Sequence, residues 1–116
     1  MPVIKKGQIT AGELAGNSAR VFANKDLGSE SLTVTEISVK PGGEIRLHTH
    51  PGHEECMVIL SGDLQATMGD VVESVSAGDT VIAPSDIVHG LKNISGETAK
   101  FLAIFPTTDI QRNWVE

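Results

Sequence analysis

Short runs of alternating apolar and polar residues, separated by glycine, proline, aspartate or asparagine, make up most of the chain. Residues 31–39 alternate in this way and are rich in threonine, valine and isoleucine. Such a pattern is typical of a strand with one buried face. The same criteria predict seven more strands, at residues 44–50, 54–60, 64–68, 71–75, 80–83, 88–93 and 99–105. Turn signals recur about every 8–12 residues, which predicts an all-β sandwich or barrel.

The two ends of the chain have weaker patterns. Residues 3–4 and 20–22 could form edge strands, and residues 10–14 could form one helical turn. Residues 106–116 show no strong periodicity, and we expect their Trp114 to pack on the barrel or on a partner subunit. Within that stretch, residues 109–112 are most simply a surface segment, although they could also cover a pocket mouth or a dimer seam.

Composition narrows the classes of function. A chain of 116 residues with 40% apolar residues fits a single domain over residues 1–116. Because it contains no tyrosine, a mechanism that needs a tyrosine acid, base or radical is excluded. The net charge of −6 argues against nucleic acid or an anionic membrane as a partner. No apolar run approaches the ~20 residues of a membrane span, no signal-peptide pattern occurs, and the lone Cys56 cannot form an internal disulfide. We therefore expect a cytoplasmic protein.

The chain has four histidines, and all lie in two short stretches. His48 and His50 are two residues apart on a predicted strand, so their side chains should point to the same face. Glu55 begins the next predicted strand, and His89 comes from a separate one. Three imidazoles and a carboxylate suit a divalent transition metal. We therefore predict a metal site formed by His48, His50, Glu55 and His89.

These two stretches resemble the two signature motifs of the cupin superfamily. The first motif occupies residues 42–62 and the second residues 78–93. The matching positions are Gly42, His48, His50, Glu55 and Gly62 in the first, and Gly78, Pro84, His89 and Asn93 in the second. The chain departs from the pattern at Asp86, where the family usually has glycine. Aspartate tolerates turn geometry, so this departure concerns the local turn and not the metal ligands.

The resemblance implies an all-β double-stranded β-helix, also called a jelly roll or cupin barrel, with the metal inside one mouth. Similar cupins hold Fe, Mn, Zn, Ni or Co through three histidines and one glutamate. Many are dimers, and the short exposed edges of such a sandwich also favour a homodimer. The same four ligands accept several ions, so the sequence leaves the identity of the metal open.

Two acidic residues and a histidine compete for roles beside the metal. Glu55 is preferred to Glu54 as the ligand because only Glu55 leaves six residues before Gly62. His53 lies two residues before Glu55. It could be a loop histidine at the rim, a proton-transfer or substrate-contact residue, or a ligand in place of Glu55.

Arg46 is a further candidate for the site. It lies two residues before His48, so we expect it on the same inward face. A buried guanidinium needs a partner. Either Glu36 or another acid pairs with it, or it binds a carboxylate or other anionic group of the substrate. The expected core and pocket wall comprise Met57, Ile59, Ile82, Ile87, Leu91, Phe101 and Phe105.

Four protein ligands leave about two open positions on a six-coordinate metal, as catalysis requires. With Fe(II), the site would suit a dioxygenase. With Mn, Zn or Ni, it would suit an isomerase or lyase in which Glu55 or His53 moves protons. A non-catalytic ligand-binding or sensory cupin is the alternative, because a fold does not fix a function. In each case the expected partner is a small molecule held by its oxygen atoms.

Overall fold

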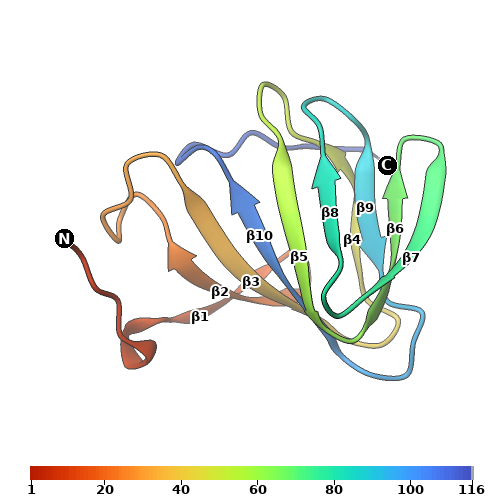
Figure 1. Ribbon diagram of the computed structural model, residues 1–116, viewed down its shortest axis with the longest axis horizontal. Coiled ribbons are helices and arrows are strands. Elements are labelled where there is room, and N and C mark those ends of the chain that lie inside the picture. The colour runs from red at the N-terminus through yellow and green to blue at the C-terminus, as the bar shows by residue number, and fades with distance from the viewer. Residues whose placement is uncertain (116) are drawn as a thin grey trace.

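Two antiparallel sheets pack face to face in the computed structural model, which describes residues 1–115 (Figure 1). The elements are η1 (Lys6–Gln8), β1 (Ala11–Leu14), β2 (Asn17–Ala23), β3 (Thr33–Val39), β4 (Glu44–Thr49), β5 (Glu55–Ser61), β6 (Asp63–Met68), β7 (Val71–Ser76), β8 (Thr80–Ala83), β9 (His89–Lys92), β10 (Ala99–Phe105) and β11 (Asn113–Trp114). One sheet has the order β1-β2-β3-β10-β5-β8 and the other β11-β4-β9-β6-β7. This arrangement confirms the predicted all-β fold class.

The strands predicted between residues 20 and 105 all occur, whereas the edge strand predicted at residues 3–4 and the helical turn predicted for residues 10–14 are wrong. Most of that segment is β1, which pairs with β2 from Ala11 opposite Arg20 to Leu14 opposite Asn17. The two-residue turn between them has a positive φ at both Ala15 and Gly16, as a tight hairpin requires. Pairing with β2 therefore decides the conformation, and the short local pattern could not reveal it.

The core lies between the two sheets and is filled by every second residue of the central strands. In β10, the inward residues are Ala99, Phe101, Ala103 and Phe105, all buried. In β5, Met57 and Ile59 are buried on the same side as Glu55. The expectation that Ile82 and Ile87 belong to the core is wrong. Ile82 is 58% exposed because its neighbours on the edge strand β8, Val81 and Ala83, take the inward positions.

A β-bulge in β4 shapes the region of the histidines. Ile45 lies opposite Leu91 and His48 lies opposite His89, so three steps along β4 match two along β9. The extra residue reverses the alternation of side chains on β4. Ile45 and His48 therefore both face inward, whereas Arg46 and Leu47 between them are exposed.

The sequence departure at Asp86 also has a visible structural consequence. Asp86 has a φ of 67°, in the left-handed region that glycine adopts without strain. Its backbone N–H donates a hydrogen bond to the carbonyl of His50, 3.2 Å away. Asp86 therefore adopts the turn conformation that glycine usually provides at this position in the family, as expected.

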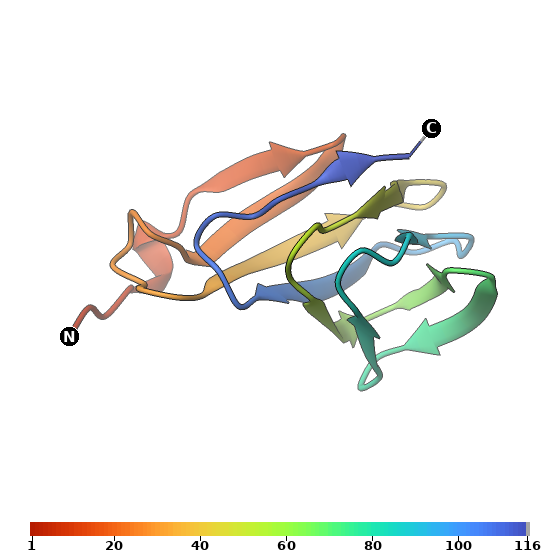
Figure 2. The same cartoon turned by 90° about the horizontal axis from the view of Figure 1, so that it is seen from above.

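The last ten described residues, 106–115, are called the C-terminal tail below. From the end of β10 the tail crosses the upper end of the barrel in Figure 1, and Figure 2 shows it curving back toward β11. It therefore starts on one sheet and ends on the other, where Asn113 and Trp114 pair with Thr49 and His48 of β4. This path covers the end of the barrel at which the histidines lie.

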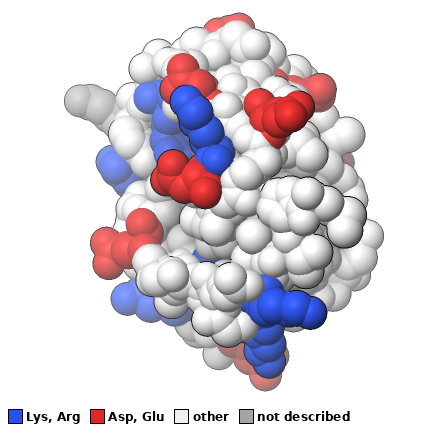
Figure 3. Space-filling view, turned by 90° about the vertical axis from the view of Figure 1, so that its left-hand side faces the viewer, with Lys and Arg blue, Asp and Glu red and all other residues white. Residues whose placement is uncertain are grey.

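Charged side chains of both signs lie next to one another on the face shown in Figure 3. That face therefore presents no extended surface of a single charge. Among residues 1–115, no helix has the length and apolar character needed to cross a membrane.

Candidate metal centre

Four buried side chains from three strands and one loop meet inside the barrel. They are His48 of β4, His50 just after β4, Glu55 at the start of β5 and His89 at the start of β9. One potential ligand atom from each lies within 4.8 Å of the others. At most 4% of each residue is exposed, so the group is almost closed to solvent. We call these four residues the histidine–glutamate cluster.

The spacing of the donor atoms fits a single transition-metal ion. His48 Nε2 and His50 Nε2 are 3.1 Å apart, and Glu55 Oε1 lies 3.0 Å from both His50 Nε2 and His89 Nε2. Adjacent ligands of an octahedral ion with bonds of about 2.1 Å are separated by about 3 Å. The three imidazoles and the carboxylate are therefore close enough together to hold one ion.

Backbone carbonyls determine which nitrogen of each imidazole faces the centre. The Nδ1 atoms of His48, His50 and His89 lie 2.7, 2.6 and 3.0 Å from the carbonyls of Arg46, Gln111 and Ile87, respectively. A carbonyl only accepts, so each Nδ1–H must donate. Each neutral ring then directs an unprotonated Nε2 toward the other donors, and this is the form that binds a metal.

Electrostatics favour the deprotonated ligands. Burial lowers the pKa of His48 to about 4, despite the opposing hydrogen bond with the Arg46 carbonyl. Burial alone would raise the pKa of Glu55, but hydrogen bonds with His50 and His89 outweigh it and lower this pKa to about 2. A metal cation in the middle of the cluster would accept the Nε2 lone pairs and offset the negative charge of Glu55.

These pKa shifts predict that the metal-free protein loses stability in acid. The pKa of His48 is 6.5 ordinarily and about 4 in the fold, so the unfolded chain binds more protons as the pH falls through this window. The free energy of unfolding should fall by roughly 3 kcal/mol between pH 7 and pH 4 from His48 alone. The low pKa of Glu55 acts in the same direction between about pH 4.5 and 2.

Urea denaturation of the metal-free protein at pH 7, 5.5 and 4 measures this loss. The variant His48→Gln lacks the main titrating group and should lose correspondingly less stability over the same range. Equal losses in the two proteins would contradict the assignment to His48.

His53 lies beside the cluster but is not one of its four potential metal ligands. Its ring stacks on that of His50, with centroids 5.1 Å apart. Its Nδ1 lies 3.1 Å from the carbonyl of Glu54, and its Nε2 accepts a hydrogen bond of 3.0 Å from the backbone N–H of Gln111. Both ring nitrogens are therefore occupied by the backbone. Of the three interpretations of His53, replacement of Glu55 in the cluster disagrees with this geometry.

The expectation that Arg46 faces inward is wrong, and the bulge in β4 is the reason. Arg46 is exposed, and its guanidinium lies over the ring of Trp114, 4.8 Å from the centroid. Glu36, its suggested partner, instead pairs with Arg20 at 3.0 Å. Even-numbered spacing predicts a shared face only where the strand is regular, and no sequence signal marked the bulge.

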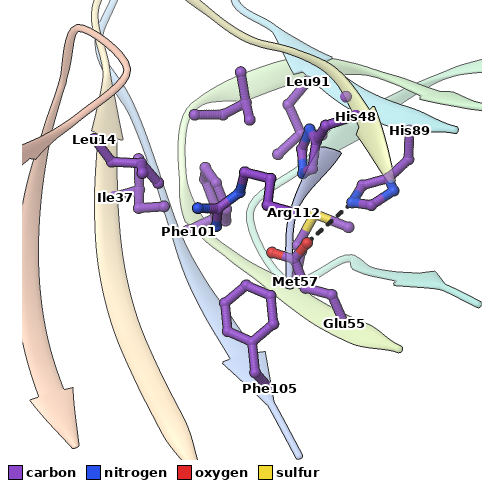
Figure 4. Close-up of a pocket in the computed structure, with 12 residues that line it drawn as sticks. Leu14, Ile37, His48, Glu55, Met57, His89, Leu91, Phe101, Phe105 and Arg112 are labelled. Atoms are coloured by element: carbon purple, nitrogen blue, oxygen red, sulfur yellow. Dashed lines mark hydrogen bonds and ion pairs between the residues drawn. The ribbon is translucent and has the colours of Figure 1, made fainter. Parts of the chain in front are cut away.

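Sequence reasoning missed Arg112, the cation that does line the cavity. The cavity beside the cluster is bounded by His48, Glu55 and His89 on one side and by apolar side chains on the other (Figure 4). Arg112 of the C-terminal tail extends into it. Of the roles considered for residues 109–112, covering a pocket mouth is the one that this position fits. The space left inside is about 20 Å³, enough for one water molecule, which needs about 10–15 Å³.

Residues 35–105 match the family described as "Cupin domain". The chain belongs to this family, which confirms the resemblance found in its motifs.

Curated relatives are similar over part of their length. A germin-like protein of Morus alba is 32% identical over 79 residues, 64% of this chain and 38% of that protein. The rhicadhesin receptor of Pisum sativum is 29% identical over 110 residues, 89% of this chain and 50% of the receptor. Mannose-1-phosphate guanylyltransferase 2 of Escherichia coli O157:H7 is 33% identical over 72 residues, 62% of this chain and 15% of the enzyme. The chain thus spans half or less of these relatives.

Solved structures agree on the double-stranded β-helix. An uncharacterized conserved protein of Klebsiella pneumoniae with a double-stranded β-helix domain has a TM-score of 0.80 at 22% identity and covers 98% of this chain and 96% of its own. Oxalate decarboxylase of Lactobacillus farciminis, in a formate complex, has a TM-score of 0.82 at 20% identity over 94% of this chain and 34% of that one. The Bacillus subtilis oxalate decarboxylase studied for its Mn(II) centres has a TM-score of 0.79 at 24% identity over 89% and 29%. At these identities the likeness shows the fold alone.

Proposed function

We propose that this cupin is a metal-dependent enzyme that acts on a small oxygenated molecule, as a dioxygenase or as an isomerase or lyase. The observation that carries the proposal is the convergence of three imidazole Nε2 atoms and one carboxylate oxygen in a closed cavity. The fixed Nδ1–H bonds prepare these donors for a divalent transition metal such as Fe, Mn, Zn, Ni or Co. When bound, such an ion supplies Lewis-acid or redox chemistry at its open positions.

The residues of the chain would divide the remaining work. The apolar wall formed by Met57, Phe101 and Phe105 keeps bulk water from the reacting molecule. Glu55 provides the negative charge that offsets a cation, and its second carboxylate oxygen, which does not face the imidazoles, can accept a proton. His53 lies at the rim, where lifting of the tail would free its Nε2 from Gln111 and allow it to exchange protons with solvent.

Metal analysis tests the first part of this proposal. Protein purified without a metal-chelating tag should contain a stoichiometric divalent metal, or take one up on reconstitution. The metal-free form should melt at a lower temperature, since an ion that binds only the folded state stabilises it. Failure to bind any of the five metals would overturn the proposal.

Turnover then separates the reaction classes. Oxygen uptake by the Fe(II) protein with small catechols, enediols or keto acids would identify a dioxygenase. A Zn or Ni protein without oxygen uptake that still forms a product would identify an isomerase or lyase. Product detection is the decisive measurement, because binding alone also shifts the melting temperature.

A non-catalytic metal-dependent binding or sensory protein is the second candidate. The C-terminal tail across the mouth of the cavity favours it, because the tail would enclose and retain a ligand. Ligand binding without product, for every metal tested, would favour this alternative.

The expected homodimer and cytoplasmic location stay predictions. What supports a dimer is the pair of edge strands β7 and β8, where Val71, Val72 and Ile82 expose 55–58% of their surface. Light scattering after gel filtration would measure the mass in solution, and a monomer at micromolar concentration would contradict the dimer.

A further inference from the structure

Arg112 is a half-buried cation, and its shielded Nε donor has no hydrogen-bond partner. Its Nε has almost no contact with solvent, and no partner for it occurs within residues 1–115. Burial lowers the pKa of this arginine, and the negative charge of Glu55 partly opposes the effect. A guanidinium does not give up its proton in proteins, so it remains charged in the cavity. An unsatisfied buried charged donor is expensive, which makes its position informative.

The surroundings of Arg112 do not supply the missing acceptor. Glu55 is the carboxylate in the cavity, and its Oε1 already faces His50 and His89. No ion pair within 4.0 Å involves Arg112 among residues 1–115, and its guanidinium carbon lies 5.5 Å from the centroid of the Trp114 ring. Figure 4 shows the side chain extending from the tail between the cluster and the apolar wall.

The charge of the filled site also calls for an anion. A divalent ion held by three neutral imidazoles and one carboxylate retains one positive charge, and Arg112 adds a second in the same enclosed space. Two like charges in a poorly solvated cavity repel each other unless an anion lies between them. A guanidinium presents N–H groups in a fork that matches a carboxylate, so a carboxylate is the anion this side chain suits best.

We propose that Arg112 binds the carboxylate of a small hydroxy or keto acid. The hydroxyl or keto oxygen of that acid would bind the ion held by the histidine–glutamate cluster. The inference rests on the proposed function, because it requires an ion in the cluster. It assigns the acid-binding role, expected from the sequence at Arg46, to a residue of the C-terminal tail. Since the enclosed space fits about one water molecule, the acid enters when the tail lifts, and Arg112 closes over it as the tail returns.

A matched pair of small molecules tests the charge requirement on the wild-type protein. Glycolate and glycolamide have nearly the same size and both offer a hydroxyl and a carbonyl oxygen, but only glycolate carries a charge. The full chain is loaded with Zn²⁺, its zinc content is measured, and each compound is titrated while the arginine Nε–H signals are followed by NMR. The chain has three arginines, at positions 20, 46 and 112, so the Arg112 signal is assigned from the variant Arg112→Lys.

Glycolate should bind roughly 10- to 100-fold more tightly than glycolamide, the usual range for a charge-assisted hydrogen bond. It should also shift the Arg112 Nε–H signal. Arg112→Met should remove most of this preference and leave the zinc content unchanged. Arg112→Lys should retain part of it, because the charge remains and the fork is lost.

Arg46→Met is the control, because Arg46 lies over the same Trp114 ring but on the outside of the barrel. It should leave the preference for glycolate unchanged. If Arg112→Met does not fold, the comparison of the two compounds and the Arg112 signal in the wild type still decide the question.

The outcomes separate the two proposals. Stoichiometric zinc with equal binding of glycolate and glycolamide, or with no change at the Arg112 signal, would overturn this inference and leave the metal site intact. Equal losses in the Arg112→Met and Arg46→Met variants would also overturn it. Failure of the wild-type protein to bind zinc or any of the other four metals would overturn the proposed function and this inference together.

Discussion

Glu55→Gln is expected to weaken metal binding by at least about 100-fold, since loss of an outer-shell partner alone typically costs 10–100-fold. Glu55 is the carboxylate of the cluster, and its Oε1 lies 3.0 Å from two imidazole nitrogens. The amide of glutamine fills the same space but carries no charge, and its NH₂ group cannot act as a ligand. Elemental analysis and competition with a chelator would measure the loss.

Glu54→Gln provides a matched control for this variant. Glu54 is the adjacent residue and is exposed, whereas Glu55 is 4% exposed. The control removes the same charge from the same segment and should bind metal as the wild type does. Unchanged affinity in Glu55→Gln, or an equal loss in Glu54→Gln, would show that Glu55 is not a ligand.

Phe101→Ala should be the most damaging substitution for stability outside the cluster. Phe101 is 1% exposed in β10 and lies between Ile37 of β3 and Ile59 of β5. Truncation of a buried phenylalanine typically lowers the free energy of unfolding by about 3–5 kcal/mol, because it leaves a cavity that the neighbours only partly fill. Urea denaturation of the metal-free protein is the appropriate measurement.

An exposed apolar residue serves as the comparison. Ile94 is 67% exposed, so Ile94→Ala should change the free energy of unfolding by less than about 0.5 kcal/mol. The ring of Phe101 also lines the metal cavity. Phe101→Ala should therefore enlarge the space beside the cluster as well as destabilise the fold. A loss no greater than that of Ile94→Ala would contradict the placement of Phe101 in the core.

The sequence was informative where a residue pattern repeats or matches a motif. The alternation of apolar and polar residues located the strands, and the two motifs predicted that residues 48, 50, 55 and 89 form one site, as they do in the structure. Both signals depend on the spacing of residues along the chain, which can be read directly from the sequence. The fold class and the family followed from them, and both agree with the structure and the comparisons.

The position of Arg46 was beyond reach because it depends on pairing between strands. A single extra residue in β4 relative to β9 turns Arg46 outward, and the residues around it carry no mark of this. Arg112 was missed for a related reason. The tail has no periodicity, and its conformation depends on contacts with β4 and with the ring of His53. Contacts between segments that are far apart in the sequence therefore determine that Arg112 lines the cavity.

The hydrogen bonds that orient the three imidazoles have an evolutionary consequence. Their acceptors are backbone carbonyls, so the orientation depends on the path of the chain and not on the identity of any neighbouring side chain. Mutations can therefore accumulate around the site while the rings keep their direction. The carbonyl of Gln111 is the most vulnerable of the three, because it lies 61 residues beyond His50. A premature stop before that residue would release His50, whereas a point substitution at that residue would leave its carbonyl in place.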